Sequence, residues 1–119
     1  MATSQTITVR KDFDVIVARS RVRDLARNLG LRTTDQARIS LATSSAARAL
    51  GLGASYQGEI VIEGVNGKER VCVRVTCRTE GGARDNVTEA TFSEARFMID
   101  EITVQTLSNG TQVIMVQWR

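Results

Sequence analysis

The chain has 119 residues, a length typical of one domain, and we expect residues 1–119 to fold as a single unit. Hydrophobic residues make up 42% of the chain and aromatic residues only 4%, which predicts an aliphatic core. The sequence has no histidine, so histidine catalysis and histidine metal ligation are excluded, and its 2 cysteines alone make no zinc site.

The charge is unevenly distributed along the chain. The net charge is +3, yet residues 1–50 carry nine Lys/Arg against four Asp/Glu, and residues 51–119 carry seven against nine. A basic first half suits an acidic protein partner or a phosphate backbone. The sequence has no apolar run long enough to span a membrane, and its start, MATSQTITV, lacks the features of a signal peptide. We therefore expect a cytoplasmic protein that does not enter the membrane.

A strand and a helix are predicted first. Alternating apolar residues predict a strand over residues 5–9, and a helix follows over about residues 14–29, capped by Asp12 or Asp14. One face of this helix carries a row of arginines spaced by four: Arg19, Arg23 and Arg27. The row is either a solvated helix face or a docking surface for an acidic partner. Nucleic acid is a weaker third option, because no aromatic residues are interleaved with the basic ones.

The longest predicted helix covers residues 33–50. Thr33 and Gln36 have the spacing of a capping box, and glycines directly after the helix supply a stop signal. Asp35 in the first turn suits the positive end of the helix dipole. The apolar stripe of this helix is rich in alanine, which predicts that it packs closely on a sheet.

Two strands are predicted next, over residues 58–63 and 71–77, with an Asn-Gly turn signal between them. Valines share one face of the second strand and mainly polar residues share the other, which predicts an antiparallel sheet with helices on one side. Cys72 and Cys77 fall on opposite faces of this strand and cannot pair with each other, which fits a reducing compartment.

A third helix is predicted after a polar loop. Thr91 and Glu94 have capping-box spacing at its start, and its apolar stripe runs as far as Ile102. This helix would place Asp100 and Glu101 near its end, as solvated surface. Neighbouring residues on a helix point apart, so the two acids would not form a paired-carboxylate site.

The chain ends in a predicted hairpin. Residues 103–107 and 112–118 read as its two strands, and Asn109-Gly110 is the favoured pair for a type I′ turn between them. Together the elements predict an α+β two-layer sandwich. Its sheet would be mixed but mainly antiparallel, and about three helices would cover one face.

The run from Asp35 to Leu50, DQARISLATSSAARAL, resembles the first nucleotide motif of the switch and anti-sigma-factor serine kinases of bacterial stress and sporulation signalling. These kinases share the ATPase fold of histidine kinases and type II topoisomerases. In the family, this helix carries a glutamate that activates the attacking group and, one turn later, an asparagine that binds magnesium. Here Ser45 stands at the glutamate position and Ala49 at the asparagine position, while Arg48 matches a position where the family tends to have arginine.

The second family motif is an aspartate followed by spaced glycines, which reads the adenine. Its expected place holds Arg78 for the aspartate and Glu80 for one glycine, and only Gly82 matches. The glycine-rich lid that follows is shortened. The vestigial pocket would consist of Ser45, Arg48, Ala49, Arg78 and Gly82. Because phosphoryl transfer depends on positioning and on magnesium, the resemblance implies the fold and the partners and argues against the activity.

Three functions are compatible with the sequence. The first is a non-catalytic or weakly nucleotide-binding regulatory domain without a cofactor, which binds an anti-sigma-factor antagonist, a sigma factor or a related phosphatase through Arg19, Arg23 and Arg27. The second is an active ATP-dependent serine-protein kinase with an atypical site; it would use ATP and magnesium, and Glu63 or Glu80 reaching the pocket would favour it. The third is a nucleic-acid-binding or structural domain. A homodimer through a strand edge or the first helix remains open.

Overall fold

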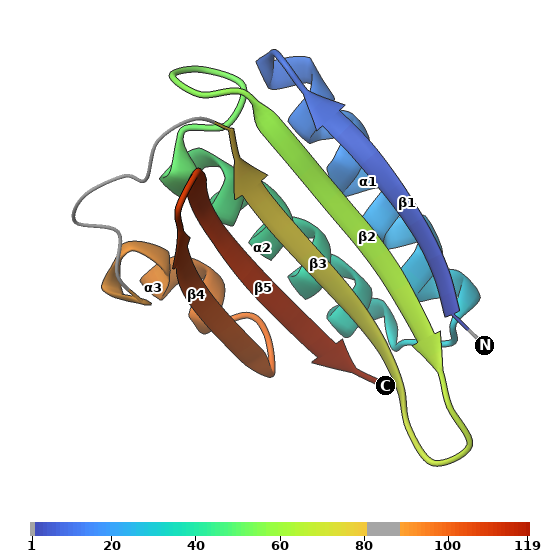
Figure 1. The fold of residues 1–119 in the computed structure, drawn as a ribbon. Helices are drawn as coiled ribbons and strands as arrows, with labels where there is room; N and C mark the ends of the chain where they lie inside the picture. The colour runs from blue at the N-terminus through green and yellow to red at the C-terminus, as the bar shows by residue number, and fades with distance from the viewer. Residues whose placement is uncertain (1, 81–88) are drawn as a thin grey trace.

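The molecule is built from one antiparallel sheet and a layer of helices that covers one of its faces (Figure 1). The structure is a computed structural model that describes residues 2–80 and 89–119. Its elements are β1 (Ala2–Val9), α1 (Asp12–Asn28), α2 (Thr33–Leu50), β2 (Gly58–Asn66), β3 (Val71–Thr79), the 3₁₀ helix η1 (Glu89–Phe92), α3 (Ser93–Arg96), β4 (Glu101–Leu107) and β5 (Gly110–Trp118). The strand order is β1-β2-β3-β5-β4, and each neighbouring pair is antiparallel. The α+β prediction is confirmed, with an antiparallel sheet in place of a mixed one.

Helix α1 packs on the sheet through small and β-branched residues spaced by three and four. These buried residues are Val15, Ala18, Val22 and Ala26. The first turn is capped by Asp14, whose carboxylate accepts the backbone N–H groups of Arg10 at 2.9 Å and Lys11 at 3.2 Å. These hydrogen bonds favour the charged form and lower the pKa of Asp14 below its ordinary value. The predicted cap is therefore supplied by Asp14, from inside the helix.

Helix α2 covers the predicted residues and ends at Gly51, whose φ of 76° lies in the left-handed region that glycine favours. The predicted capping box is wrong. Arg32 is the N-cap, Thr33 is already helical, and the Gln36 side chain donates to a backbone oxygen before the helix at 2.9 Å. The buried apolar face consists of Ile39, Ala42, Ala46, Ala47 and Leu50. None of the described helices is both long enough and apolar enough to cross a membrane.

A buried polar contact fastens the start of α2 to the last strand. Asp35 is 3% exposed, and its carboxylate accepts hydrogen bonds from Gln117 Nε2 at 3.1 Å and Arg32 Nε at 3.2 Å. A buried carboxylate without such partners is costly, so the contact holds the helix in place over β5. Asp35 and Gln117 are 82 positions apart in the chain, so no local feature of the sequence predicts this contact.

Strand β3 contains the two cysteines, and both are buried. Cys72 and Cys77 are both free, and the five-residue offset between them on one strand sets them on opposite faces, as predicted. Burial raises the pKa of Cys77 to about 12 and also raises the pKa of Cys72. Neither thiol is therefore a nucleophile at neutral pH.

The predicted third helix is wrong beyond its first turn. Helix α3 ends at Arg96, and β4 begins at Glu101 and pairs with β5. Ile102 therefore lies in a strand. Pairing with β5 also gives both acids a partner: Asp100 accepts the backbone N–H of Trp118 at 2.9 Å, and Glu101 accepts the indole N–H of the same residue. Both acids are exposed, as predicted, but they lie where β4 begins and not at the end of a helix.

The final hairpin is confirmed, but its turn is displaced by one residue. Leu107 pairs with Gly110, so the two turn residues are Ser108 and Asn109. Gly110 is the first residue of β5 and is buried. A Cβ atom there would lie 2.3 Å from the backbone oxygen of Thr79, so the glycine is required by close approach of the neighbouring strand.

Candidate functional site

Helix α2 turns one side toward η1 and α3, and a hollow of about 350 Å³ lies between them. It is lined by Ser45, Arg48 and Ala49 from α2, and by Thr91, Ser93 and Glu94 from the η1–α3 segment. The structure thus brings together all the motif positions that sequence analysis identified on this helix. A hollow of this volume is at the small end of the range for ligand sites.

Two buried side chains hold the η1–α3 segment against α2. Phe92 is 1% exposed and Ala95 is fully buried, and both belong to the main hydrophobic core. On the other wall, Ser45 and Ala49 lie one above the other because they are one helical turn apart. Ala46 next to them is fully buried. Both walls of the hollow are therefore fixed by core packing.

Glu94 is a lining residue that sequence analysis did not assign to the site. Its predicted capping box with Thr91 is wrong, because the N-cap of α3 is Phe92 and no side chain caps the helix. Both residues instead face α2 across the hollow. No local signal could have revealed this, since the position of Glu94 beside Ser45 depends on how α3 docks on α2.

The chemical groups of the hollow do not fit a magnesium–nucleotide site of the family's kind. Mg²⁺ prefers an octahedral set of oxygen ligands and usually takes one or two carboxylates together with substrate phosphates. Here Ala49 presents a methyl group where the resemblance implies an amide, and Glu94 is the one carboxylate among the lining residues. The described part of the chain contains no group of three or more metal-ligating side chains. Arg48 remains as a cation that suits an anionic group.

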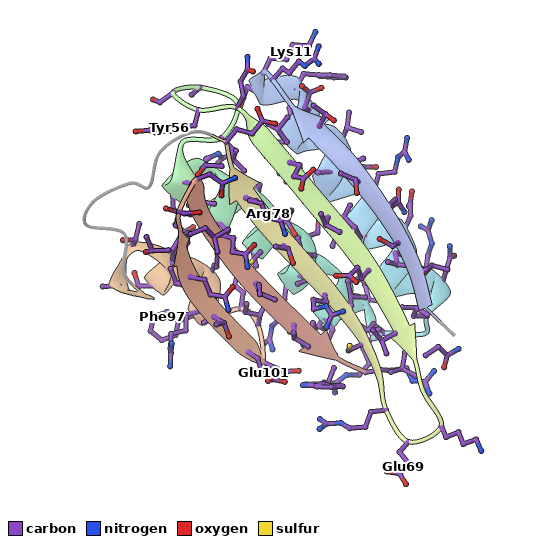
Figure 2. All side chains as sticks on the ribbon, viewed as in Figure 1. Lys11, Tyr56, Glu69, Arg78, Phe97 and Glu101 are labelled. Atoms are coloured by element: carbon purple, nitrogen blue, oxygen red, sulfur yellow. The ribbon has the colours of Figure 1, made fainter. Side chains whose placement is uncertain are left out.

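Arg78 lies on the opposite, helix-free face of the sheet (Figure 2). Its guanidinium donates to Glu59 at 2.6 Å and to Gln112 at 2.9 Å, which are its cross-strand neighbours on β2 and β5. Cys77 and Thr79 on either side are buried, so strand alternation turns Arg78 the other way. Arg78 is therefore separated from the Ser45 hollow, and Gly82 lies outside the described residues.

The two glutamates that sequence analysis considered for the pocket also lie elsewhere. Glu63 binds Arg74 through two hydrogen bonds of 3.1 and 3.0 Å. Glu80 lines a separate hollow of about 420 Å³ together with Arg78 and its neighbours. Neither lines the hollow that contains Ser45.

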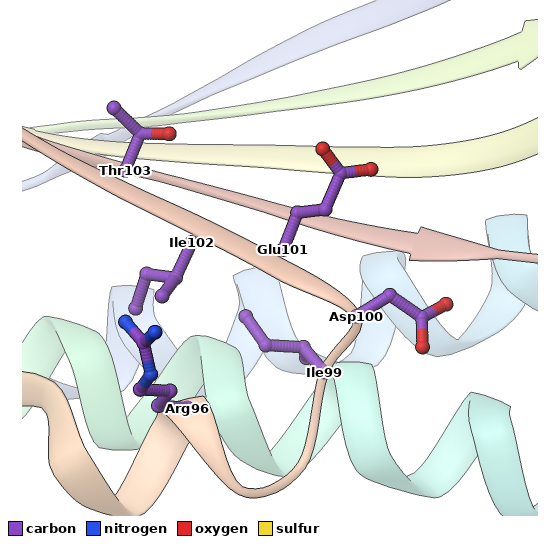
Figure 3. Close-up of a pocket in the computed structure, with 6 residues that line it drawn as sticks. All are labelled: Arg96, Ile99, Asp100, Glu101, Ile102 and Thr103. Atoms are coloured by element: carbon purple, nitrogen blue, oxygen red, sulfur yellow. The ribbon is translucent and has the colours of Figure 1, made fainter.

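A third hollow, of about 330 Å³, lies between α3 and β4 (Figure 3). The guanidinium of Arg96 lies next to Ile102, while the carboxylates of Asp100 and Glu101 point away from Arg96 (Figure 3). Both acids bind Trp118, whose ring also lies 3.7 Å from the Arg70 guanidinium. The two carboxylates at this hollow are thus occupied by Trp118, so it is a weaker site candidate than the Ser45 hollow.

The arginine row on α1 runs beside α2. Arg23 and Arg27 are exposed and Arg19 is half-buried. Arg27 forms a surface ion pair with Asp24 at 2.9 Å, and the backbone oxygen of Arg19 accepts the Ser40 hydroxyl at 3.2 Å. The row is therefore a cationic strip along the outer side of the helix layer.

Comparison with known proteins finds similarity along nearly the whole chain, although no protein-family model matches it. The serine/threonine-protein kinase RsbT of Bacillus subtilis (strain 168) is 29% identical over 126 aligned positions, which cover 94% of each chain. The crystal structure of the RsbU and RsbW domains of Rv1364c from Mycobacterium tuberculosis superposes with a TM-score of 0.72 at 17% identity. That match covers 100% of this chain and 33% of the other, so this chain spans a third of that structure's length.

These comparisons carry different weight. At 17% identity the structural match establishes a shared fold and no more. The match to the kinase RsbT extends along nearly the whole sequence. The run DQARISLATSSAARAL in α2 resembles the same group of proteins. The chain is therefore similar to the kinase RsbT along nearly its whole length, and it shares its fold with the solved RsbU–RsbW structure.

Proposed function

We propose that the chain is a regulatory domain that acts by binding a protein partner and does not transfer phosphate. One observation carries the proposal: Ser45 and Ala49, which the resemblance aligns with the family's activating glutamate and magnesium-binding asparagine, both line the hollow between α2 and α3. The resemblance suggests sigma-factor signalling in bacteria as the setting. The partner would be an anti-sigma-factor antagonist, a sigma factor or a related phosphatase.

The loss of each group has a chemical consequence. An asparagine oxygen can bind magnesium, whereas the methyl group of Ala49 cannot. A serine hydroxyl needs a base beside it before it can itself act in proton transfer, so Ser45 does not replace a glutamate. Arg78 stands at the position that the resemblance aligns with the family's adenine-binding aspartate. Its guanidinium donates a hydrogen bond to Glu59 on the other face of the sheet. Positioning and charge neutralisation, the two requirements of phosphoryl transfer, are both missing from this arrangement.

A titration with magnesium and ATP tests this proposal. We expect no saturable heat in isothermal calorimetry up to about 1 mM nucleotide, equivalent to a binding free energy weaker than about −4 kcal/mol. Incubation with radiolabelled ATP and a purified antagonist domain should leave the antagonist unlabelled. Magnesium without nucleotide is the control titration. A micromolar dissociation constant, or label on the antagonist, would contradict the proposal.

The alternative is an active kinase with an atypical site, and the position of Glu94 favours it. This carboxylate lines the same hollow as Ser45 and Arg48, where it could accept a proton while the guanidinium binds a phosphate. The same radiolabel assay separates the two functions. If the alternative holds, the wild type labels the antagonist and Glu94→Gln lowers the rate by about 10²–10⁴-fold, the usual contribution of a general base.

The cationic strip on α1 is the surface we propose for the partner. Arg23→Glu should weaken the complex with the partner by about tenfold or more, and the loss should shrink as salt rises, because an exposed charge acts through screened electrostatics. Lys68→Glu is the matched control: it makes the same charge change at an exposed position between β2 and β3, away from α1. Equal affinities of the two variants in calorimetry would remove this surface from the proposal.

A further inference from the structure

The helix layer carries large apolar side chains that the core does not use. In the described chain the exposed ones are Phe13, Ile16, Leu41 and Phe97. Phe97 projects from the segment after α3 (Figure 2), whereas the other three belong to α1 and α2. Ile16 is 52% exposed and Leu41 is 50% exposed. Exposed apolar residues that occur singly need no explanation, but a group rimmed by charge indicates an interaction site.

A hydrogen bond between the helices fixes how these residues lie relative to one another. Helices α1 and α2 are neighbours joined by a short connection, so they run antiparallel, and the Ser40 hydroxyl donates to the Arg19 backbone oxygen at 3.2 Å. With a rise of 1.5 Å per residue, Ile16 and Leu41 then differ in height by only about 3 Å. They lie at the same level on the two helices that flank the seam.

Arginines lie beyond the apolar pair at both ends of the seam. On α1, Arg23 follows Ile16 by seven residues, and on α2, Arg48 follows Leu41 by seven, so each arginine is two turns away on the same face. Because the helices are antiparallel, the two arginines lie at opposite ends. Across both helices five arginines are exposed against two aspartates, and one of these aspartates is paired with Arg27. The surface is therefore apolar at its centre and cationic at its ends.

We propose that this seam, defined by Ile16, Arg23, Leu41 and Arg48, docks an acidic amphipathic helix of the partner protein. Apolar side chains of that helix lie on Ile16 and Leu41, and its carboxylates face Arg23 and Arg48. An amphipathic helix binds a partner's surface through apolar anchors spaced by three, four and seven residues. From Arg23 to Arg48 the seam is about 18 Å long, which about 12 helical residues span. The inference rests on the proposed function for the existence of a partner.

The charge of the seam favours an acidic helix over a second copy of the chain. A second copy of the chain would bring a cationic seam against a cationic seam, which costs free energy on association. An acidic helix neutralises the arginines instead and leaves the apolar centre free to exclude water. A lipid surface with anionic headgroups would also neutralise them, but it calls for larger apolar residues along a whole helix face, and each helix contributes only one or two here.

A synthetic peptide tests the seam directly. The peptide has about 18 residues, five helical turns, with leucines along one face and glutamates on both flanks. Titrated into the ¹⁵N-labelled chain, it should shift amide signals of α1 and α2 on the seam side, saturably and less strongly at high salt. Leu41→Asp should abolish these shifts. Phe97→Asp is the matched control, the same kind of change at an exposed apolar residue outside the seam, and should leave them unchanged.

Four outcomes would overturn the inference. Equal shifts with a peptide carrying lysine for glutamate would remove the charge argument, and absence of shifts would remove the site. A dimer that Leu41→Asp dissociates would assign the seam to a second copy. Binding to phosphatidylglycerol vesicles without binding to the peptide would assign it to lipid. Tight binding of magnesium and ATP would remove only the non-catalytic proposal, so the two failures are distinguishable.

Discussion

Phe92→Ala should lower the free energy of unfolding by about 3–5 kcal/mol, the usual cost of removing a phenylalanine side chain from a packed core. Phe92 is 1% exposed and is the largest fully buried side chain among the residues that the structure describes. Phe97→Ala, the same change five residues further on, should cost less than about 0.5 kcal/mol because exposed positions contribute little. Phe97 is 91% exposed. Urea unfolding followed by circular dichroism measures both.

The pair also tests how the hollow is held together. Phe92 lies in the core cluster while Thr91 and Glu94 on either side line the hollow against Ser45. Losing the phenylalanine therefore loosens the wall that carries Glu94, and amide exchange in the η1–α3 segment should rise more than in α1. Equal costs for the two alanine variants would mean that η1 and α3 are not anchored through Phe92, and the described hollow would not be a stable site.

Local sequence signals were sufficient to predict the bounds of an element where its own residues end it. Helix α2 has the predicted bounds because the helical periodicity stops at Gly51, whose backbone is left-handed. Local signals were insufficient where pairing with another strand decides between helix and strand. Ile99 and Ile102 are spaced by three, which fits a helix, but Ile102 and Val104 are also spaced by two, which fits a strand. Pairing with β5 selected the strand. The hairpin signal at Asn109-Gly110 predicted this partner only for residues 103–107, and the pairing extends two residues further back, to Glu101.

In the candidate site, too, some residues could be predicted from the sequence and others could not. Ser45, Arg48 and Ala49 share one side of one helix, so their meeting in the hollow follows from helical spacing alone. Arg78 was assigned to the same pocket by motif position. The alternation of β3 already argued against this, because the valines face the helices and Arg74 and Arg78 belong to the other face. Glu94 could not be found from sequence, because its role depends on tertiary packing.

Ile39→Ala should lower the free energy of unfolding by about 2–5 kcal/mol, whereas Leu41→Ala should change it by less than about 0.5 kcal/mol. Ile39 is fully buried and Leu41 is 50% exposed, although both lie near the middle of α2. Alanine favours helix slightly over either residue, so backbone propensity cannot produce the difference. Thermal and urea unfolding measure it.

The stabilities of the two alanine variants show whether Leu41 is a core residue or a docking residue. If its truncation leaves stability unchanged and weakens binding of the acidic peptide, the fold carries this leucine without needing it, as expected of a docking residue. If Leu41→Ala costs as much as Ile39→Ala, the leucine is a core residue that the helix layer requires, and the seam is not a free surface. The stability measurement therefore constrains the binding inference before any partner is identified, because a side chain half exposed to water cannot supply core packing of that size.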